Sequence, residues 1–122
     1  LLPTPDCKPD TNEKFAKHIL YFDYKSTLPS PAVVEEILMQ IKISSPQPKG
    51  IRITAHTDSK GSKAYNIKLS TQRAEALAQI FKEKFPQMRL LSCGKAFEQQ
   101  ILPETDSKGN DLPENRAQNR RA

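Results

Sequence analysis

The stretch that decides the fold covers residues 51–78 and reads IRITAHTDSKGSKAYNIKLSTQRAEALA. Its first six residues alternate apolar and polar side chains, which is typical of a half-buried strand. A polar turn follows, and apolar residues then recur at helical spacing until shortly before Pro86, which cannot continue a helix. The sequence therefore predicts a strand at 51–56, a turn, and a long helix at 63–84.

Two opposite charges in this stretch, Asp58 and Arg73, need an explanation. Arg73 is four residues after Leu69 and four before Leu77, so a helix places its side chain on the apolar stripe. Burying an unpaired guanidinium costs roughly several kcal/mol, so Arg73 requires acidic or hydrogen-bonding partners there. Asp58 lies just past the end of the strand, where open α/β sheets place their ligands.

The two charges allow two interpretations. Together with the free N–H groups of the helix start they suit a zwitterionic ligand, because the carboxylate would bind an ammonium group and the guanidinium a carboxylate. Alternatively, Asp58 only forms the turn, and Arg73 only forms a structural ion pair with it. The pattern of residues by itself favours this structural interpretation.

The flanking sequence predicts further strands and helices. We expect a strand at 17–23, a helix at 31–43 with Ser30 as its N-cap and Pro31 in its first turn, and a strand at 89–93. A polar excursion occupies 97–115, a short helical turn follows Pro113, and residues 120–122 begin a last strand. The order strand, helix, strand indicates a crossover unit with its helices packed on the sheet. The predicted apolar stripe of the first helix consists of Val33, Ile37 and Ile41, with Val34 and Leu38 beside them.

One short sequence occurs twice. The pentapeptide TDSKG stands at 57–61 and again at 105–109, without a second copy of the strand and helix around it. Because Asp, Ser and Gly favour turns in general, we interpret the pair as repeated turn chemistry.

Length and composition indicate one soluble globular domain. The chain has 122 residues, of which 36% are apolar and 27% charged, and no apolar run is long enough to cross a bilayer. The net charge of +5 weakly favours an anionic partner. Aromatic residues make up only 7% and Trp is absent, which argues against a nucleic-acid partner.

No pattern for catalysis, a metal or a cofactor is present. The two histidines, His18 and His56, lack a third ligand at suitable spacing, and Cys93 has no basic partner nearby in the sequence. Neither a nucleophile elbow nor a phosphate-binding loop occurs. We therefore expect no catalytic residue, no metal site, no cofactor and no nucleic acid.

The chain contains two cysteines, Cys7 and Cys93. If they pair, the disulfide ties an N-terminal arm to the body of the domain; otherwise one is a surface thiol and the other is buried. The sequence favours neither alternative. No secretory signal or lipoprotein cleavage site is visible before Cys7, so we expect the sequence to be part of a longer protein.

The residues around Asp58 and Arg73 strongly resemble the signature of OmpA-like C-terminal domains. These are the peptidoglycan-associating modules of outer-membrane protein A, the Pal lipoprotein and flagellar motor protein B. The central resemblance rests on His56-Thr57-Asp58, Gly61, Tyr65-Asn66, Leu69-Ser70 and Arg73-Ala74. Flanking resemblances are Leu20-Tyr21-Phe22-Asp23, similar to the family's first strand, and Asn115-Arg116-Ala117-Gln118-Asn119-Arg120-Arg121, similar to its closing RAxNRR motif. Ala55 stands where the family usually has Gly.

The resemblance implies an α+β fold: an OmpA-like β-α-β-α-β core with a final strand, in which a mixed sheet has its helices packed on one side. Residues 14–122 would form the peptidoglycan-binding domain and residues 1–13 an arm or linker. By resemblance, Asp58 would bind the ammonium group of diaminopimelate in the peptidoglycan stem peptide, and Arg73 would bind its carboxylate. The other residues expected at this site are Asn66, Leu69, Thr27, Leu28 and one of Arg120 or Arg121.

The function implied by the resemblance is a non-catalytic module that anchors an envelope protein, such as a lipoprotein, to the cell wall. It would act in the periplasm, attached to the outer membrane of a Gram-negative bacterium, with membrane contact only through a segment outside this sequence. The alternative is a structural component of an envelope-spanning secretion or motor complex that binds protein partners.

Overall fold

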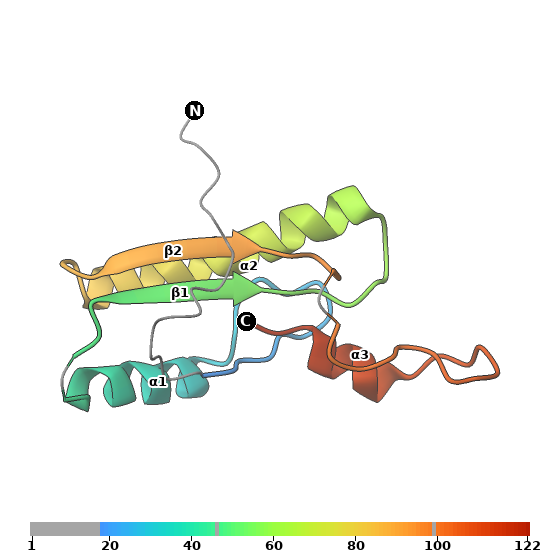
Figure 1. The fold of residues 1–122 in the computed structure, drawn as a ribbon, viewed down its shortest axis with the longest axis horizontal. Coiled ribbons are helices and arrows are strands. Elements are labelled where there is room, and N and C mark those ends of the chain that lie inside the picture. The colour runs from blue at the N-terminus through green and yellow to red at the C-terminus, as the bar shows by residue number, and fades with distance from the viewer. Residues whose placement is uncertain (1–17, 46, 99) are drawn as a thin grey trace.

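The computed structural model describes residues 18–45, 47–98 and 100–122. It contains α1 (Pro31–Ile43), β1 (Gly50–Ala55), α2 (Lys63–Lys84), β2 (Arg89–Gly94) and α3 (Pro113–Asn119), as Figure 1 shows. The two long helices have the predicted bounds, each of these two strands agrees to within one residue, and α3 is the helical turn expected after Pro113. Within the described ranges, no helix combines the length and hydropathy that crossing a membrane requires.

The strands β1 and β2 run parallel, and α2 forms the crossover between them. Their register places Ile53 opposite Ser92 and Ala55 opposite Gly94. A Cβ atom added to Gly94 would lie 2.5 Å from the backbone nitrogen of Thr71 in α2. Glycine at this position therefore allows the helix to approach the end of β2 closely.

The first and last described segments pair with each other beside β1. Leu20 and Ala122 exchange two backbone hydrogen bonds of 2.9 Å each, and the N–H of His56 donates to the carbonyl of Arg121 at 2.7 Å. The strand expected at 17–23 is wrong as an extended element, since the described part contains only an isolated antiparallel bridge between Tyr21 and Arg121. The residues that pair with this segment, 120–122, follow directly after α3, which ends at Asn119. The parallel pair and this antiparallel contact together confirm a mixed arrangement.

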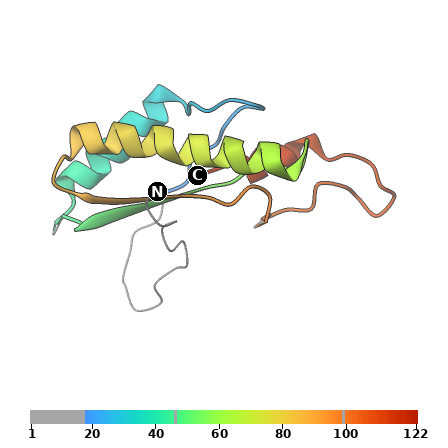
Figure 2. The ribbon, with the colours of Figure 1, turned by 90° about the horizontal axis from the view of Figure 1, so that it is seen from above.

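Both long helices lie on the same side of the strands (Figure 2). Ser62 caps α2, because its hydroxyl accepts a hydrogen bond of 3.1 Å from the backbone N–H of Tyr65. Ser30 occupies the N-cap position of α1, but its side chain makes no capping hydrogen bond there. Val33 is 39% exposed, so the apolar stripe of α1 is shifted by one residue from the prediction toward Val34.

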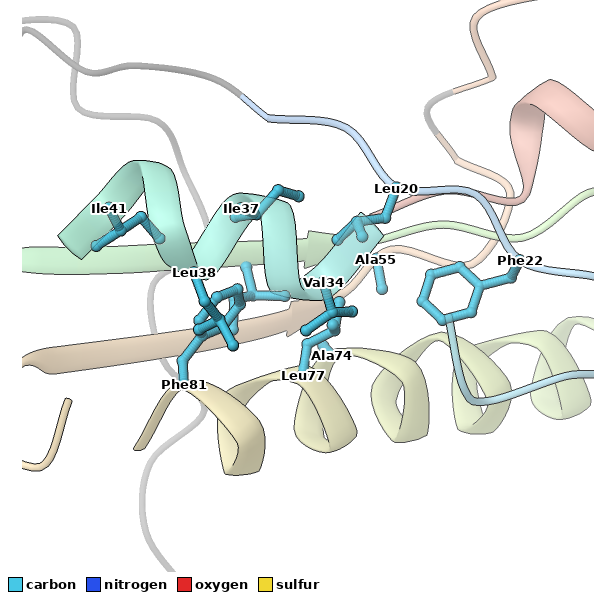
Figure 3. Packing of buried hydrophobic residues seen from close by; sticks show 11 residues of the cluster. Leu20, Phe22, Val34, Ile37, Leu38, Ile41, Ala55, Ala74, Leu77 and Phe81 are labelled. Atoms are coloured by element: carbon cyan, nitrogen blue, oxygen red, sulfur yellow. The ribbon is translucent and has the colours of Figure 1, made fainter. Parts of the chain in front are cut away.

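The hydrophobic core fills the space between the two long helices and the strands (Figure 3). In α2, Leu77 is fully buried and Ala74 almost so, while Ala55 closes the end of β1. The remaining core residues are Leu20, Phe22, Val34, Ile37, Leu38, Ile41, Ile53 and Phe81. Toward the start of α2 the buried stripe becomes polar at Arg73, and this is where the candidate site lies.

Candidate functional site

Asp58 lies in the turn that connects β1 to α2. Its Oδ1 accepts a hydrogen bond of 3.0 Å from the backbone N–H two residues later, and Gly61 closes the turn with a φ of 91°. The second TDSKG copy has the same geometry: Oδ1 of Asp106 accepts from the N–H two residues later at 2.8 Å, and Gly109 has a φ of 83°. The interpretation of the repeat as turn chemistry is confirmed.

The second oxygen of the Asp58 carboxylate binds Arg120. The Nη1 of Arg120 lies 3.0 Å from Oδ2 of Asp58, and this carboxylate is almost completely buried. The Nε of Arg120 donates to the carbonyl of Phe22 at 2.9 Å. Arg120 therefore joins the segment after α3 to the first described segment and to the turn after β1.

Arg73 is fully buried on α2 and donates to three backbone carbonyls. Its Nε bonds the carbonyl of Ser26 at 2.7 Å, its Nη1 that of His56 at 3.0 Å, and its Nη2 that of Asp23 at 3.1 Å. The guanidinium carbon also lies 4.7 Å from the centre of the Phe22 ring, a cation–π distance. The side chain thus fixes the loop after Phe22 to the end of β1.

The electrostatic environment of Arg73 contains one charge of each sign. Burial, and after it the positive charge of Arg120, lower the pKa of Arg73 to about 10, while the negative charge of Asp58 acts in the opposite direction. Arg73 is therefore still a cation at neutral pH. Two guanidinium groups and one carboxylate leave this part of the molecule with one positive charge in excess, which favours an anionic group.

The arrangement differs from both sequence-based interpretations of Asp58 and Arg73. Within the described ranges the ion-pair partner of Asp58 is Arg120 and not Arg73. Nor do the two side chains border an open space, because Arg73 has no exposed surface and Asp58 is only 3% exposed. The physical reason is that backbone carbonyls and Arg120 satisfy these charges, and sequence spacing does not reveal either kind of partner.

Asn66 and Leu69 lie on the same buried face of α2 as Arg73. The Nδ2 of Asn66 donates to the carbonyls of Lys60 at 2.8 Å and Ser62 at 3.1 Å. Asn66 therefore braces the turn that carries Asp58. Leu69 is 7% exposed and supplies an apolar wall beside it.

The loop after Phe22 contains the predicted site residues Thr27 and Leu28, and their neighbour Ser26 contacts Arg73. The hydroxyl of Ser26 accepts from the backbone N–H of Leu28 at 3.2 Å, which shapes the loop so that the carbonyl of Ser26 reaches Arg73. Thr27 is half-buried, and the side chain of Leu28 is 67% exposed.

Of the two arginines at the end of the sequence, Arg120 binds Asp58, whereas the Nη1 of Arg121 lies 3.4 Å from the carbonyl of Asn119.

The buried carboxylate of Glu104, which the sequence did not predict as a site residue, supports the turn that carries Asp58. Oε1 of Glu104 accepts from the backbone N–H of Ser59 at 2.9 Å and from Nη1 of Arg116 at 2.6 Å, and its Oε2 accepts from Nδ2 of Asn119 at 2.8 Å. Glu104 thus ties the excursion at 97–115 to the turn next to Asp58. The signal that could have found it is the closing motif, which contains both Arg116 and Asn119.

One of the two cysteines, Cys93, lies in β2. Cys93 is 3% exposed and is not a free thiol. Cys7 lies outside the described residues, so the pairing of Cys7 with Cys93 stays a prediction.

A cavity of about 430 Å³ lies next to Arg120. Tyr21, Phe22 and Asp23 line it from one side, and Ala117 and Gln118 of α3 from the other. In the part of the chain that the structure describes, no group of three His, Cys, Asp or Glu side chains is arranged to hold a metal ion.

Comparison with solved structures identifies proteins of similar fold. The peptidoglycan-associated lipoprotein from Burkholderia pseudomallei superposes with a TM-score of 0.64 and 28% sequence identity over 95% of each chain. The cell wall anchor of the T6SS from Pseudomonas aeruginosa has a TM-score of 0.61 and 23% identity, over 83% of this chain and 70% of that one. The periplasmic domain of Helicobacter pylori MotB has a TM-score of 0.60 and 21% identity, over 84% and 66%. The last two show the fold alone.

Comparison with curated proteins finds one further similarity. The photosystem I P700 chlorophyll a apoprotein A2 from Gloeobacter violaceus is 40% identical over 72 residues, or 58% of this chain. The chain spans only 8% of that protein's length.

The family model described as OmpA family matches residues 22–120. This range includes the three charged residues Asp58, Arg73 and Arg120 and all five helices and strands found among the described residues. The match covers most of the sequence and agrees with the fold. The chain belongs to the OmpA family.

Proposed function

We propose that this domain binds peptidoglycan and thereby anchors the protein or complex that carries it to the cell wall. Membership of the OmpA family supports the proposal, as does similarity over 95% of both chains to a peptidoglycan-associated lipoprotein. We place the domain in the periplasm of a Gram-negative bacterium, attached to the outer membrane. The role is one of binding and not of catalysis.

The observation that carries the proposal is the buried group of Asp58, Arg73 and Arg120 at the end of β1. The ligand we propose is the diaminopimelate of the stem peptide, whose end carries an ammonium and a carboxylate. Asp58 would bind the ammonium, and Arg73 would bind the carboxylate. The excess positive charge of the group suits this division, because the ligand carboxylate meets two guanidinium groups.

The contacts of Arg73 suit such a role. A guanidinium has five N–H donors, and three of those on Arg73 bond backbone carbonyls. The carbonyls hold the planar group in one orientation, so little conformational freedom is left to lose on binding. Ligand entry requires neighbouring side chains to move aside while these three contacts are kept, because Arg73 has no exposed surface in this conformation.

The first experiment measures co-sedimentation of the domain with purified peptidoglycan sacculi. The Asp58→Asn variant removes the charge that would bind the ammonium, and we expect it to stay in the supernatant. The matched control is Asp106→Asn, because Asp106 forms the same TDSKG turn but is bound to Asn110 and not to Arg120. Equal sedimentation of Asp58→Asn and the wild type would show that the assigned site is wrong.

A second experiment tests the ligand itself by calorimetric titration. Lysine has the side-chain ammonium of diaminopimelate but lacks the carboxylate beside it. If Arg73 binds that carboxylate, the domain should bind a stem tripeptide that ends in meso-diaminopimelate at least about tenfold more tightly than the same tripeptide ending in lysine, since losing a charge-assisted bidentate contact costs about 1.4 kcal/mol or more. Equal affinity for the two tripeptides contradicts the role of Arg73.

The burial of Arg73 also favours a second candidate function. A guanidinium already bound to three carbonyls and fully buried is what a purely structural residue would show. In that case the domain keeps the fold and binds a protein within a larger envelope complex. A folded wild-type domain that neither sediments with sacculi nor binds diaminopimelate would establish this alternative.

A further inference from the structure

Two lysines from different segments meet at one exposed aromatic ring near the candidate site. The Nζ of Lys25 lies 5.4 Å from the centre of the Tyr24 ring, and the Nζ of Lys60 lies 5.7 Å from it. Both distances are within the cation–π range. Tyr24 itself is 51% exposed, and neither lysine forms an ion pair within the described ranges. We call Tyr24, Lys25 and Lys60 the rim cluster.

The backbone at Lys25 is in a conformation that lysine rarely adopts. Its φ is 62°, and the N–H of Ser26 bonds the carbonyl of Asp23 at 3.0 Å, so Lys25 occupies the third position of a tight turn. Turns that need a positive φ at this position normally use Gly or Asn. A strained residue with a long charged side chain indicates that the side chain has a use that glycine could not supply.

The rim cluster is attached directly to the residues of the candidate site. The carbonyls of Asp23 and Ser26, on either side of Tyr24 and Lys25, are two of the three that bind Arg73. The backbone N–H of Lys60 is the group that binds Oδ1 of Asp58. The two lysines therefore extend from the two segments that hold the opposite charges of the site.

We propose that the rim cluster is a second anion subsite, which binds a carboxylate of the stem peptide outside the diaminopimelate. This inference rests on the proposed function. The carboxylate and ammonium of the diaminopimelate end are assigned to Arg73 and Asp58, so the charges that remain on the stem peptide are carboxylates. The one we assign is the α-carboxylate of the glutamate that precedes diaminopimelate. Because that glutamate is joined through its γ-carboxyl group to the opposite end of diaminopimelate, its α-carboxylate lies beyond the length of the diaminopimelate side chain.

No acidic side chain of the described residues forms an ion pair with Lys25 or Lys60, so the carboxylate that binds them can come from the ligand. The hydrogen bond from Arg116 is the main cause that lowers the pKa of Asp111, and the positive charge of Lys60 adds to it, but the carboxylate itself is bound by Arg116. Asp23 is exposed and is not among the ion pairs of the described residues. Two ammonium groups beside one ring repel each other, and a carboxylate between them relieves the repulsion. The Tyr24 ring adds an apolar surface for the peptide backbone.

The test is a calorimetric titration with three probes: free meso-diaminopimelate, a stem tripeptide with a free glutamate α-carboxylate, and the same tripeptide with that carboxylate amidated. The variant is Lys25→Gly combined with Lys60→Gln, and the matched control is Lys82→Gln near the end of α2. Because exposed ion pairs are individually weak, we expect the double variant to lose about fivefold in affinity for the acidic tripeptide. Its affinity for the amidated tripeptide and for diaminopimelate should be unchanged.

The strain at Lys25 provides a second measurement, thermal stability, beside the affinity for the acidic tripeptide. If Lys25 were only structural, its substitutions would not change the two quantities in the pattern that follows. Lys25→Gly alone should raise the midpoint of thermal unfolding, because glycine adopts a φ of 62° freely, while Lys25→Gln should not. Both substitutions should weaken binding of the acidic tripeptide equally, since both remove the charge.

The outcomes separate this inference from the proposed function. Wild-type binding of all three probes, with the double variant binding the acidic tripeptide as tightly as the wild type does, overturns the second subsite and leaves the proposed function intact. An equal loss of affinity for all three probes also overturns it, because the lysines would then support the whole site. Failure of the wild type to bind any probe overturns the proposed function and the subsite with it.

Discussion

Arg120 and Asp58 form an ion pair of 3.0 Å across 62 residues of sequence. It joins the segment after the last helix to the turn after β1, and it neutralises the charge of a carboxylate that has almost no contact with water. The closing motif of the chain is therefore part of the candidate site in the structure, although 47 residues separate Arg120 from Arg73 in the sequence.

Replacing Arg120 should destabilise the fold. In Arg120→Gln the buried Asp58 carboxylate loses its charged partner, and we expect a loss of about 2–3 kcal/mol in the free energy of unfolding. Urea unfolding followed by circular dichroism measures the change. The control is Arg52→Gln, an exposed arginine on β1, which should change stability by less than about 0.5 kcal/mol. Similar stability of both variants would mean that the ion pair contributes little.

The shape of the Arg73 side chain matters in addition to its charge. Arg73→Lys keeps a cation but cannot donate to three carbonyls in the directions of a guanidinium, so we expect a loss of about 2–3 kcal/mol in stability. Affinity for diaminopimelate should fall as well. Urea unfolding and calorimetry check the two effects separately. Retained affinity in a destabilised but folded variant would show that Arg73 is structural only.

Gly94 and Gly109 provide a matched pair for testing close packing. A Cβ on Gly94 would lie 2.7 Å from the hydroxyl of Ser70 and still closer to Thr71, so Gly94→Ala should cost at least about 2 kcal/mol by pushing α2 away from β2. Gly109 has no atom within 4 Å of such a Cβ but has a φ of 83°, so Gly109→Ala should cost only about 1 kcal/mol. Thermal unfolding of the two variants compares the costs. The reverse order would contradict the close approach of helix and strand.

Glu104 should be necessary for the excursion at 97–115 to stay bound to the body. In Glu104→Gln one oxygen becomes an N–H₂ group, which cannot accept from Ser59 and Arg116 or from Asn119, so we expect a loss of about 2 kcal/mol. Hydrogen exchange should increase at the backbone N–H of Ser59 more than in the core of α2. Glu75→Gln, at an exposed position of α2, is the control and should leave both quantities unchanged.

Acid should weaken the second TDSKG turn through Asp106. Hydrogen bonds from the backbone and side chain of Asn110 lower the pKa of Asp106 below its ordinary 3.8. The ionised form is therefore favoured in the folded state, and the stabilisation is fully present above pH 3.8 and is lost as the pH falls through the lower folded value. Between about pH 5 and about pH 3, the thermal midpoint of Asp106→Asn should fall less than that of the wild type. An equal fall in both proteins would contradict this coupling.

The elements of the fold were predictable because their signals are local. Pro31 and Pro86 delimit helices by backbone chemistry, and the alternation at 51–56 sets the strand that precedes α2. The strand expected at 17–23 failed because its pairing depends on a segment about a hundred residues later. Propensity alone says nothing about such a long-range pairing.

The site was predictable in its residues but not in its contacts. The position of Arg73 on an apolar stripe required partners, and the structure supplies backbone carbonyls from three loop or strand-end positions. Backbone acceptors have no sequence signature, since every residue carries one. Glu104 was missed for another reason: its donors come from residues 12 to 45 positions away, a separation that no local pattern spans.

The pairing of Leu20 with Ala122 has a mechanical consequence. Tension that lifts the chain ahead of Leu20 away from the sheet loads two reciprocal hydrogen bonds first and the bond from Phe22 to Arg120 next. The contacts that resist after these belong to Arg120, at the carbonyl of Phe22, and to Arg73, at the carbonyl of Asp23. Force entering at this end of the domain is thus transmitted to the two guanidinium groups together with the core side chains of Leu20 and Phe22.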